Sequence, residues 1–141
     1  VNAVYYPVSI KDLSKTDRRE SGYCRVKVEG KDLSFYGKKI KTKNKNFWVY
    51  AANPGKIKKP TNSHPIVQSY VDLFIGGCFQ IKERYKINEF PKQCVETTTE
   101  WSKHWVNDRV HARRPFLVPN FYKIDKLLSN YFDYYLENKY Q

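Results

Sequence analysis

Methionine is absent from the 141 residues, and cysteine occurs only three times. Because translation begins with methionine, we expect a processed, trimmed or partial chain that starts at Val1. No apolar run approaches the ~20 residues that a membrane-crossing helix needs, so no membrane association is expected. The three cysteines form no Cys-x-x-Cys pair and cannot all pair with one another, which favours a reducing compartment and predicts a cytoplasmic protein.

Acidic residues are also few, fourteen against twenty-six lysines and arginines, so the formal net charge is +12. Residues 1–59 carry a net charge of +10 and residues 60–141 only +2. A basic segment of this kind attracts nucleic acid or another polyanion through counterion release. Lysine, asparagine and tyrosine are all frequent, as they are in proteins of AT-rich genes. The simpler interpretation of the basic segment is therefore that its lysines are ordinary surface residues. The lysines concerned are Lys38, Lys39, Lys41, Lys43, Lys45, Lys56, Lys58 and Lys59.

The spacing of apolar residues and the turn signals predict a strand and a helix, then further strands, and from residue 65 onward mainly helices. Ser9 with Asp12 three residues later is typical of a helix cap. Gly76 and Gly77 either break the helix that contains them or allow another segment to approach closely. The expected strands cover 2–9, 23–29, 33–36 and 46–51, and the expected helices cover 10–20, 65–78, 94–105 and 124–136.

Two carboxylates share a face with two apolar residues in the first expected helix. Ile10, Leu13, Asp17 and Glu20 lie at offsets of 0, 3, 7 and 10, which places them on one side of a helix. If the apolar pair anchors the helix, the carboxylates turn toward the interior or a cleft, where a raised pKa suits a general base or acid. The alternative is that these carboxylates reach water or pair with arginine. The arginines within reach are Arg18, Arg19 and Arg25.

The order of several short motifs carries a family resemblance. A strand of the form Val-x-Ala-Val precedes a short helix that ends in Glu20, and Tyr23 then opens an alternating strand. A later apolar strand contains Tyr50 and leads through a proline-containing turn into a helix. In this order and spacing, residues 1–78 resemble the gamma-glutamylcyclotransferase family. The matching segments are 1–4, 13–20, 22–28, 47–50 and 66–77.

The resemblance implies both a fold and a reaction. The fold would be α+β, with a mixed barrel-like β-sheet of the gamma-glutamylcyclotransferase type and helices packed around it. Residues 1–141 would form a single domain, in which residues 79–141 are a C-terminal helical extension. Family members release 5-oxoproline from a gamma-glutamyl amide, because the substrate's own α-amine attacks its γ-carbonyl, and they use no metal and no cofactor. By position, Glu20 is the catalytic general base and then acid, and Tyr23 lines the substrate pocket. The resemblance thus implies a transferase or lyase that acts on a small gamma-glutamyl substrate.

Two departures from the family pattern bear on this expectation. The family's first strand ends in a Tyr-Gly-Ser loop whose backbone N–H groups hold the substrate, and this chain has no such loop. Tyr36-Gly37-Lys38 is superficially similar but follows Glu20, and Ser21 stands where the family usually has glycine. A chain that begins after a lost first strand would lack these donors and be inactive alone. The alternative is a non-catalytic binding module that uses the lysines between 38 and 59.

The last third of the sequence concentrates acidic, histidine and arginine residues. Glu100 and His104 share a helical face, but no His-Glu-x-x-His or similar pattern appears, so no metal site is predicted. We expect residues 107–115 to fold back with their arginines paired to nearby acids, or else to form an anion-binding rim. The final helix is amphipathic, so it packs on its own domain or, as the alternative, forms the contact of a homodimer.

Overall fold

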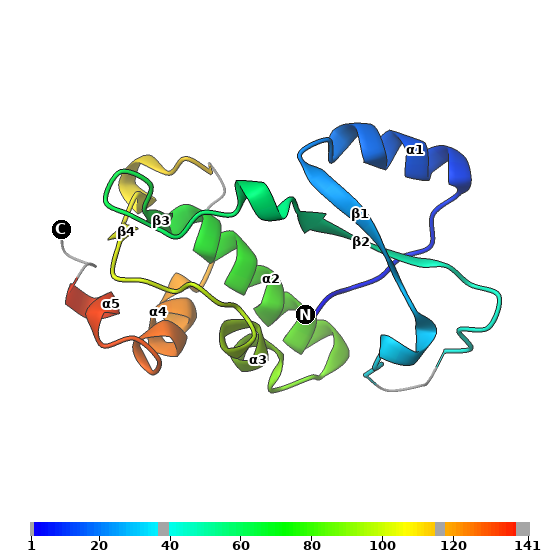
Figure 1. Cartoon of the computed structure of the whole chain (residues 1–141). Helices are drawn as coiled ribbons and strands as arrows, with labels where there is room; N and C mark the ends of the chain where they lie inside the picture. Colours follow the sequence, from blue (N-terminus) through cyan, green and yellow to red (C-terminus); the bar gives the residue numbers. More distant parts are fainter. Residues whose placement is uncertain (1, 37–39, 115–117, 138–141) are drawn as a thin grey trace. The chain divides into compact units, whose positions relative to one another are not determined.

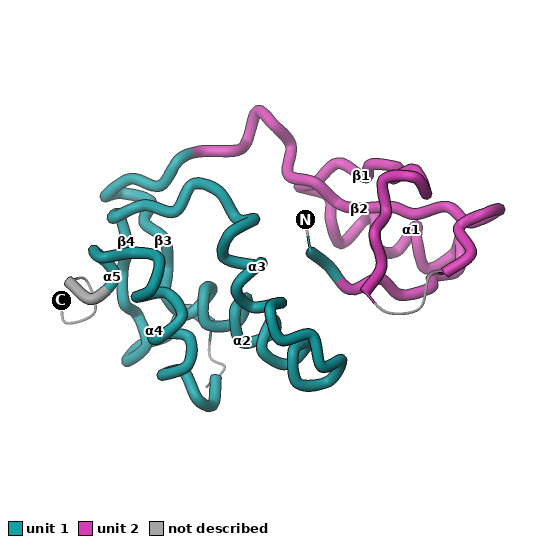
Figure 2. Tube along the Cα trace, turned by 90° about the horizontal axis from the view of Figure 1, so that it is seen from below, with its two compact units in different colours: residues 1–3, 59–141 teal, residues 4–58 magenta. Residues whose placement is uncertain are grey.

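The structure is a computed structural model that describes residues 2–36, 40–114 and 118–137 (Figure 1). The chain divides into two compact units (Figure 2). Unit 1 comprises residues 1–3 and 59–141, and unit 2 comprises residues 4–58. Helices and short sheets occur together, which confirms the predicted α+β class. The single domain over residues 1–141 stays a prediction.

The described residues of unit 2 form one α-helix and a two-stranded sheet, besides short 3-10 turns. Helix α1 (Ile10–Arg19) begins after Ser9, whose Oγ accepts a hydrogen bond of 3.1 Å from the Asp12 N–H. This is the cap that the sequence predicts, because a side-chain oxygen satisfies one of the free N–H groups at a helix start. Strands β1 (Tyr23–Val28) and β2 (Phe47–Ala52) pair antiparallel. All three elements match their predicted ranges to within one residue.

Two other predicted strands are wrong. Residues 2–9 and 33–36 belong to no strand. In the first segment, Pro7 has no N–H group to donate to a sheet. The second segment follows the last pair of the β1–β2 sheet, Val28 with Phe47, and has no strand opposite it among the described residues.

Unit 1 is mainly helical and contains the buried core. Its elements are β3 (Ile66–Val67), α2 (Gln68–Tyr85), α3 (Phe90–Glu96), β4 (Trp105–Val106), α4 (Phe121–Ser129) and α5 (Tyr134–Glu137). The long helix α2 contacts α3 and α4 (Figure 1), and the short strands β3 and β4 pair in parallel. Every buried apolar residue of the described chain belongs to this unit, and Ile75, Val95, Ile124 and Leu128 are fully buried.

Helix α2 runs through the Gly76-Gly77 pair without a break. A Cβ atom on Gly76 would lie 2.9 Å from Cγ1 of Val118, closer than side chains normally approach. The sequence left two alternatives open, a break in the helix or the close approach of another segment. The structure confirms the close approach, which glycine permits because it has no Cβ atom.

Two predicted helices of the C-terminal half are shorter than expected. The helix expected over 94–105 is α3, which already ends at Glu96. The β-branched residues Thr97 and Thr98 follow, and their hydroxyls donate back to carbonyls of the preceding turn, which is a common way to end a helix. The helix expected over 124–136 is divided into α4 and α5.

The two sheets differ in direction as well as in position along the chain. The β1–β2 sheet is antiparallel and the β3–β4 sheet is parallel, with two strands in each. The described residues hold no closed barrel, so only the α+β class of the predicted fold is confirmed. No described helix combines the length and the apolar character needed to cross a lipid bilayer. The homodimer contact expected on the final helix stays a prediction.

Candidate functional site

The residues predicted as catalytic and substrate-binding lie on either side of a tight turn in unit 2. Glu20 caps the C-terminal end of α1, and its carbonyl accepts a hydrogen bond of 2.9 Å from the N–H of Tyr23, the first residue of β1. The Glu20 carboxylate accepts a hydrogen bond of 2.9 Å from Nε of Arg19. The alternative expected from sequence, a helix-end carboxylate paired with arginine, therefore describes Glu20. The Tyr23 side chain is about half exposed.

Asp17, rather than Glu20, is the carboxylate of α1 that binds to the strands. Its Oδ2 accepts a hydrogen bond of 3.0 Å from Nη1 of Arg25, and its Oδ1 accepts one of 2.6 Å from the Tyr50 hydroxyl. Burial, followed by the hydrogen bond to Asp17, raises the pKa of Tyr50. The expectation that Ile10 anchors the helix is wrong, because its side chain is almost fully exposed. The hydrogen bonds of Asp17 to Arg25 and Tyr50, rather than an apolar contact of Ile10, attach the helix to the strands.

Two cavities lie away from the predicted catalytic pair. The larger, in unit 2, has a volume of about 330 Å³ and is lined by apolar groups and by the hydroxyls of Ser34 and Thr42. None of its described lining residues is charged, so nothing in it matches the carboxylate and amine of a gamma-glutamyl substrate. The smaller, in unit 1, has a volume of about 90 Å³. Glu20 and Tyr23 line neither cavity.

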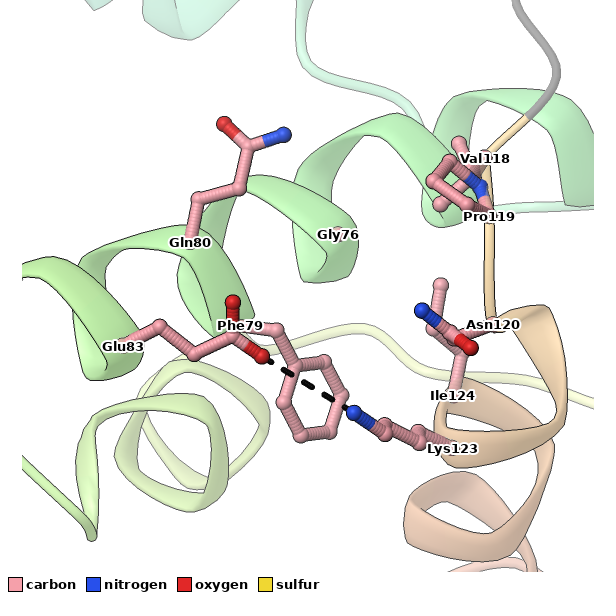
Figure 3. Close-up of a pocket in the computed structure, with 9 residues that line it drawn as sticks. All are labelled: Gly76, Phe79, Gln80, Glu83, Val118, Pro119, Asn120, Lys123 and Ile124. Carbon is pink, nitrogen blue, oxygen red and sulfur yellow. Dashed lines mark ion pairs between the residues drawn. The ribbon is translucent and has the colours of Figure 1, made fainter.

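The smaller cavity lies between α2 and the chain that leads into α4 (Figure 3). Glu83 on α2 and Lys123 on α4 form an ion pair of 3.8 Å beside it. Ligand pockets usually have volumes of roughly 300–1,000 Å³, and a water molecule occupies about 30 Å³ in the liquid. This cavity therefore has room for a few water molecules but not for a dipeptide, and its two charged groups neutralise each other.

Unit 2 presents the basic residues that the sequence predicts as a polyanion site. It carries fourteen lysines and arginines and five acids, a net charge of +9. Lys38 and Lys39 lie outside the described residues, and Lys59 lies 3.7 Å from Glu100 in unit 1. The other five predicted lysines are exposed and form no ion pair with any residue that the structure describes. They are Lys41, Lys43, Lys45, Lys56 and Lys58.

Trp48 joins the basic residues of unit 2, although no sequence motif marks it. The guanidinium carbon of Arg25 lies 4.7 Å from the centroid of the Trp48 ring, and Lys27 is directly opposite Trp48 in the β1–β2 register. Alternation already places Arg25 and Lys27 on one face of β1. The missing information was the pairing of the two strands, because only the register brings the tryptophan onto that face.

Arg109 is the centre of the buried polar contacts of unit 1. Its guanidinium donates two hydrogen bonds to Asp72 and two to Asp125, at 2.7 to 3.1 Å. The Tyr135 hydroxyl donates a hydrogen bond of 2.7 Å to Asp125. Burial alone would lower the pKa of Arg109, but its hydrogen bonds to the two carboxylates raise it. The expected pairing of the arginines in 107–115 with acids is confirmed for Arg109, which links α2 to α4.

Glu96 and His104, on which a metal site in segment 96–111 would depend, have separate partners. The Glu96 carboxylate accepts a hydrogen bond of 3.0 Å from the Tyr131 hydroxyl. Nδ1 of His104 lies 2.6 Å from Oδ1 of Asn62. Within the described residues, no group of three or more histidine, cysteine or acidic side chains is placed to hold a metal ion.

No family model, curated protein or solved structure matches the chain. The resemblance to the gamma-glutamylcyclotransferases therefore stays a prediction, and the function rests on the geometry of the chain's own residues. In that geometry Glu20 and Tyr23 are adjacent but line neither cavity, whereas unpaired cations and an exposed tryptophan gather in unit 2.

Proposed function

We propose that unit 2 is a polyanion-binding module and that its polyanion is a nucleic acid. The observation that carries this proposal is the set of five exposed lysines between residues 41 and 58 that form no ion pair with any described residue. Their charge is not cancelled inside the unit, because four of its five acids already pair with other cations. The paired cations are Lys15, Arg19, Arg25 and Lys27.

The unpaired lysines lie on both sides of strand β2 along the chain. Lys43 and Lys45 shortly precede the strand, Lys56 is the last residue of the turn that follows it, and Lys58 comes two residues later. Each cation that meets a phosphate releases condensed counterions, so several modest contacts add up to useful affinity at low salt. Cations spread in this way suit an extended polyanion better than a single small anion.

The dependence of binding on salt tests this function. We expect the full chain to bind a DNA duplex of about 20 base pairs, with log K falling by ~0.9 per phosphate contact for each tenfold rise in salt. The double substitution Lys43→Gln and Lys45→Gln should reduce that slope by about two. The matched substitutions Lys86→Gln and Lys126→Gln, at exposed lysines of unit 1, should leave it unchanged. Binding that does not respond to salt, or equal losses in the two pairs, contradicts the proposal.

A second candidate function is gamma-glutamyl cyclisation on a cyclotransferase-type fold, with Glu20 as the proton shuttle and Tyr23 beside the substrate. The observation that bears on this candidate is the turn in which the Tyr23 N–H donates a hydrogen bond to the Glu20 carbonyl, because it holds the two residues side by side. Release of 5-oxoproline from gamma-glutamyl dipeptides should stop in Glu20→Gln and continue in Glu29→Gln. Unchanged release in Glu20→Gln contradicts this candidate. Turnover of a small substrate should also vary little with salt, which separates it from polyanion binding.

We also propose a reducing, cytoplasmic location. Cys24, Cys78 and Cys94 are free thiols in the structure. Burial, followed by the hydrogen bond to Cys94, raises the pKa of Cys78, so this thiol is protonated and unreactive at neutral pH. Three unpaired cysteines are typical of proteins in reducing compartments. Titration of the unfolded protein, purified without reductant, should find three free thiols, and a disulfide-linked species contradicts the proposed location.

A further inference from the structure

One face of the β1–β2 sheet combines an aromatic ring with cations. The strand register places Arg25 and Lys27 on the same face as Trp48. Asp17 of α1 accepts a hydrogen bond of 3.0 Å from Arg25, whose guanidinium carbon lies 4.7 Å from the centroid of the Trp48 ring. The carboxylate therefore fixes the guanidinium against one side of the indole, where the attraction between a cation and a π-system stabilises it.

Trp48 differs in its surroundings from the other two tryptophans of the chain. Trp101 and Trp105 stack on each other in unit 1 at a centroid separation of 5.7 Å and pack against the buried core. Trp48 is 39% exposed, in a unit whose described residues include none that is buried. A core position explains the first two rings. The third needs another explanation, because its aromatic surface faces water beside Arg25.

On the basis of the polyanion function proposed above, we infer that the ligand of unit 2 is single-stranded nucleic acid and that one of its bases stacks on Trp48. Bases in a duplex already stack on their neighbours, whereas a single strand offers free π-faces to an aromatic side chain. Arg25 occupies one side of the ring, so the base takes the other. The lysines attract any polyanion, and the ring selects the one with unpaired bases.

Two lysines are neighbours of Trp48, one across the sheet and one along the chain. Lys27 is its cross-strand neighbour and lies 3.7 Å from the Glu29 carboxylate, and the unpaired Lys45 precedes it by three residues, which span at most about 11 Å of chain. In the inferred complex, the phosphates beside a base stacked on Trp48 meet the Lys45 amine and compete with Glu29 for the Lys27 amine. This combination of a stacking ring and nearby cations is the usual arrangement for single-strand binding without sequence preference.

The next residue of the same strand provides a matched control. Val49 is 40% exposed, the same as Trp48 within one percentage point, but alternation places it on the opposite face of the sheet. Substitution of either residue by alanine removes a comparably exposed side chain from β2. Only Trp48→Ala removes a stacking surface. Trp48→Phe retains a smaller ring and tests whether the effect follows aromatic area.

The experiment compares the affinities of the full chain for three probes by fluorescence anisotropy at low salt. The probes are oligo(dT) and oligo(U) of about 12 nucleotides and a DNA duplex of equal length. Trp48→Ala should weaken binding of the single strands by about 5- to 150-fold, the range expected for one stacked base, and should change duplex binding less than about twofold. The affinity of Trp48→Phe for the single strands should lie between the affinities of Trp48→Ala and of the unsubstituted chain. Val49→Ala should bind the single strands as tightly as the unsubstituted chain does.

A second readout does not depend on the alanine variant folding. Single strands should quench part of the tryptophan emission of the unsubstituted chain, and Trp48→Phe should abolish that quenching while still binding the probes. Tighter binding of oligo(U) than of oligo(dT) assigns the ligand to RNA, the reverse order assigns it to DNA, and both results support a single strand.

Three results would overturn the inference. Equal affinity for single strands and duplex, together with unchanged binding in Trp48→Ala, rejects the stacked base but keeps the charge-driven function. Quenching that persists in Trp48→Phe rejects Trp48 as the stacking ring. Failure of every probe to bind at low salt rejects the polyanion function as well.

Discussion

Each unit of the chain contains an aspartate that accepts hydrogen bonds from one arginine and one tyrosine, but in opposite surroundings. In unit 1, Asp125 binds Arg109 and Tyr135, and its side chain is 7% exposed. In unit 2, Asp17 binds Arg25 and Tyr50, and its side chain is 40% exposed. The Arg109 set also contains a second carboxylate, Asp72, so the two sets differ in burial and in the number of acids that the arginine binds.

Burial decides what each set can do. A charge taken out of water must keep its partners, because an uncompensated buried charge is strongly destabilising. The Arg109 set therefore holds α2 and α4 together and has little freedom for anything else. Exposed ion pairs contribute about 0–1 kcal/mol, so the Arg25 set adds little to stability. Its arginine is free to lie over Trp48 at the surface, where a ligand can reach the ring.

The largest expected effect is the loss of Arg109. Arg109→Ala leaves Asp72 and Asp125 buried without their cation, and we expect the free energy of unfolding of unit 1 to fall by about 3–5 kcal/mol. Arg25→Ala, the matched change in unit 2, should cost at most about 1 kcal/mol. Native-state hydrogen exchange of the α2 and β1 amides measures each unit separately. Similar losses in the two variants would show that burial does not distinguish the two sets.

The apolar residues should show the same contrast at a slightly smaller scale. Leu128→Ala empties a fully buried position of unit 1 and should cost about 2–5 kcal/mol, from lost burial and the cavity that remains. Val49→Ala, at a 40% exposed position of unit 2, should change stability by no more than about 0.5 kcal/mol. Urea unfolding followed by circular dichroism gives both values. A large cost for Val49→Ala would reveal a partner covering that face of the sheet.

Local order in unit 2 could be read from the sequence because it depends on neighbouring residues. Ser9 and Asp12 mark the start of α1, and alternation over 23–29 correctly assigns the two faces of β1. Alternation does not say which face is covered. The apolar face of the strand carries Val26, yet Val26 is exposed, and the polar face with Arg25 is the one that contacts α1.

The candidate site was harder to predict because its partners are distant in sequence. Asp17 and Glu20 share a helical face, and only the position of Tyr50, 33 residues further on, decides that Asp17 binds to the strands. In unit 1 the sequence indicated that arginines of 107–115 pair with acids. It did not identify Asp72, 37 residues from Arg109, because no local pattern fixes how α2 lies against that segment.

Acid should weaken unit 1 through Asp108. Its carboxylate accepts hydrogen bonds from the N–H groups of Ser69 and Arg113 and from the Ser69 hydroxyl. Burial alone would raise the pKa of Asp108, but these hydrogen bonds, that of Arg113 first, lower it. A lowered pKa in the folded state stabilises the fold above the unfolded value of about 3.9, and this contribution is lost as pH falls through the folded value.

Asp108→Asn should therefore flatten the acid limb of the stability curve of unit 1 below about pH 4, where the carboxylate otherwise takes up a proton. Urea unfolding at a series of pH values measures the slope. The exposed Asp133→Asn serves as the control and should leave the slope as it is in the unsubstituted chain. An unchanged slope in Asp108→Asn contradicts the role given to these hydrogen bonds.

The smallest expected effect concerns the start of α1, because no described residue of unit 2 is buried and able to support the helix. Ser9→Ala removes the oxygen that accepts the Asp12 N–H and should lower the stability of α1 by about 1 kcal/mol. Ser14 is also exposed, but it lies inside the helix, where alanine has the higher helix propensity. Ser14→Ala should therefore stabilise α1 by a few tenths of a kcal/mol.

Hydrogen exchange of the α1 amides measures both serine variants without unfolding unit 1. Opposite signs for the same chemical change would show that position relative to the helix end, rather than loss of a hydroxyl, controls stability here. Because α1 holds Arg25 through Asp17, the fraying caused by Ser9→Ala should also loosen the guanidinium from Trp48. We expect a small weakening of single-strand binding in Ser9→Ala and none in Ser14→Ala. Equal binding in both variants would mean that Trp48 acts without the arginine behind it.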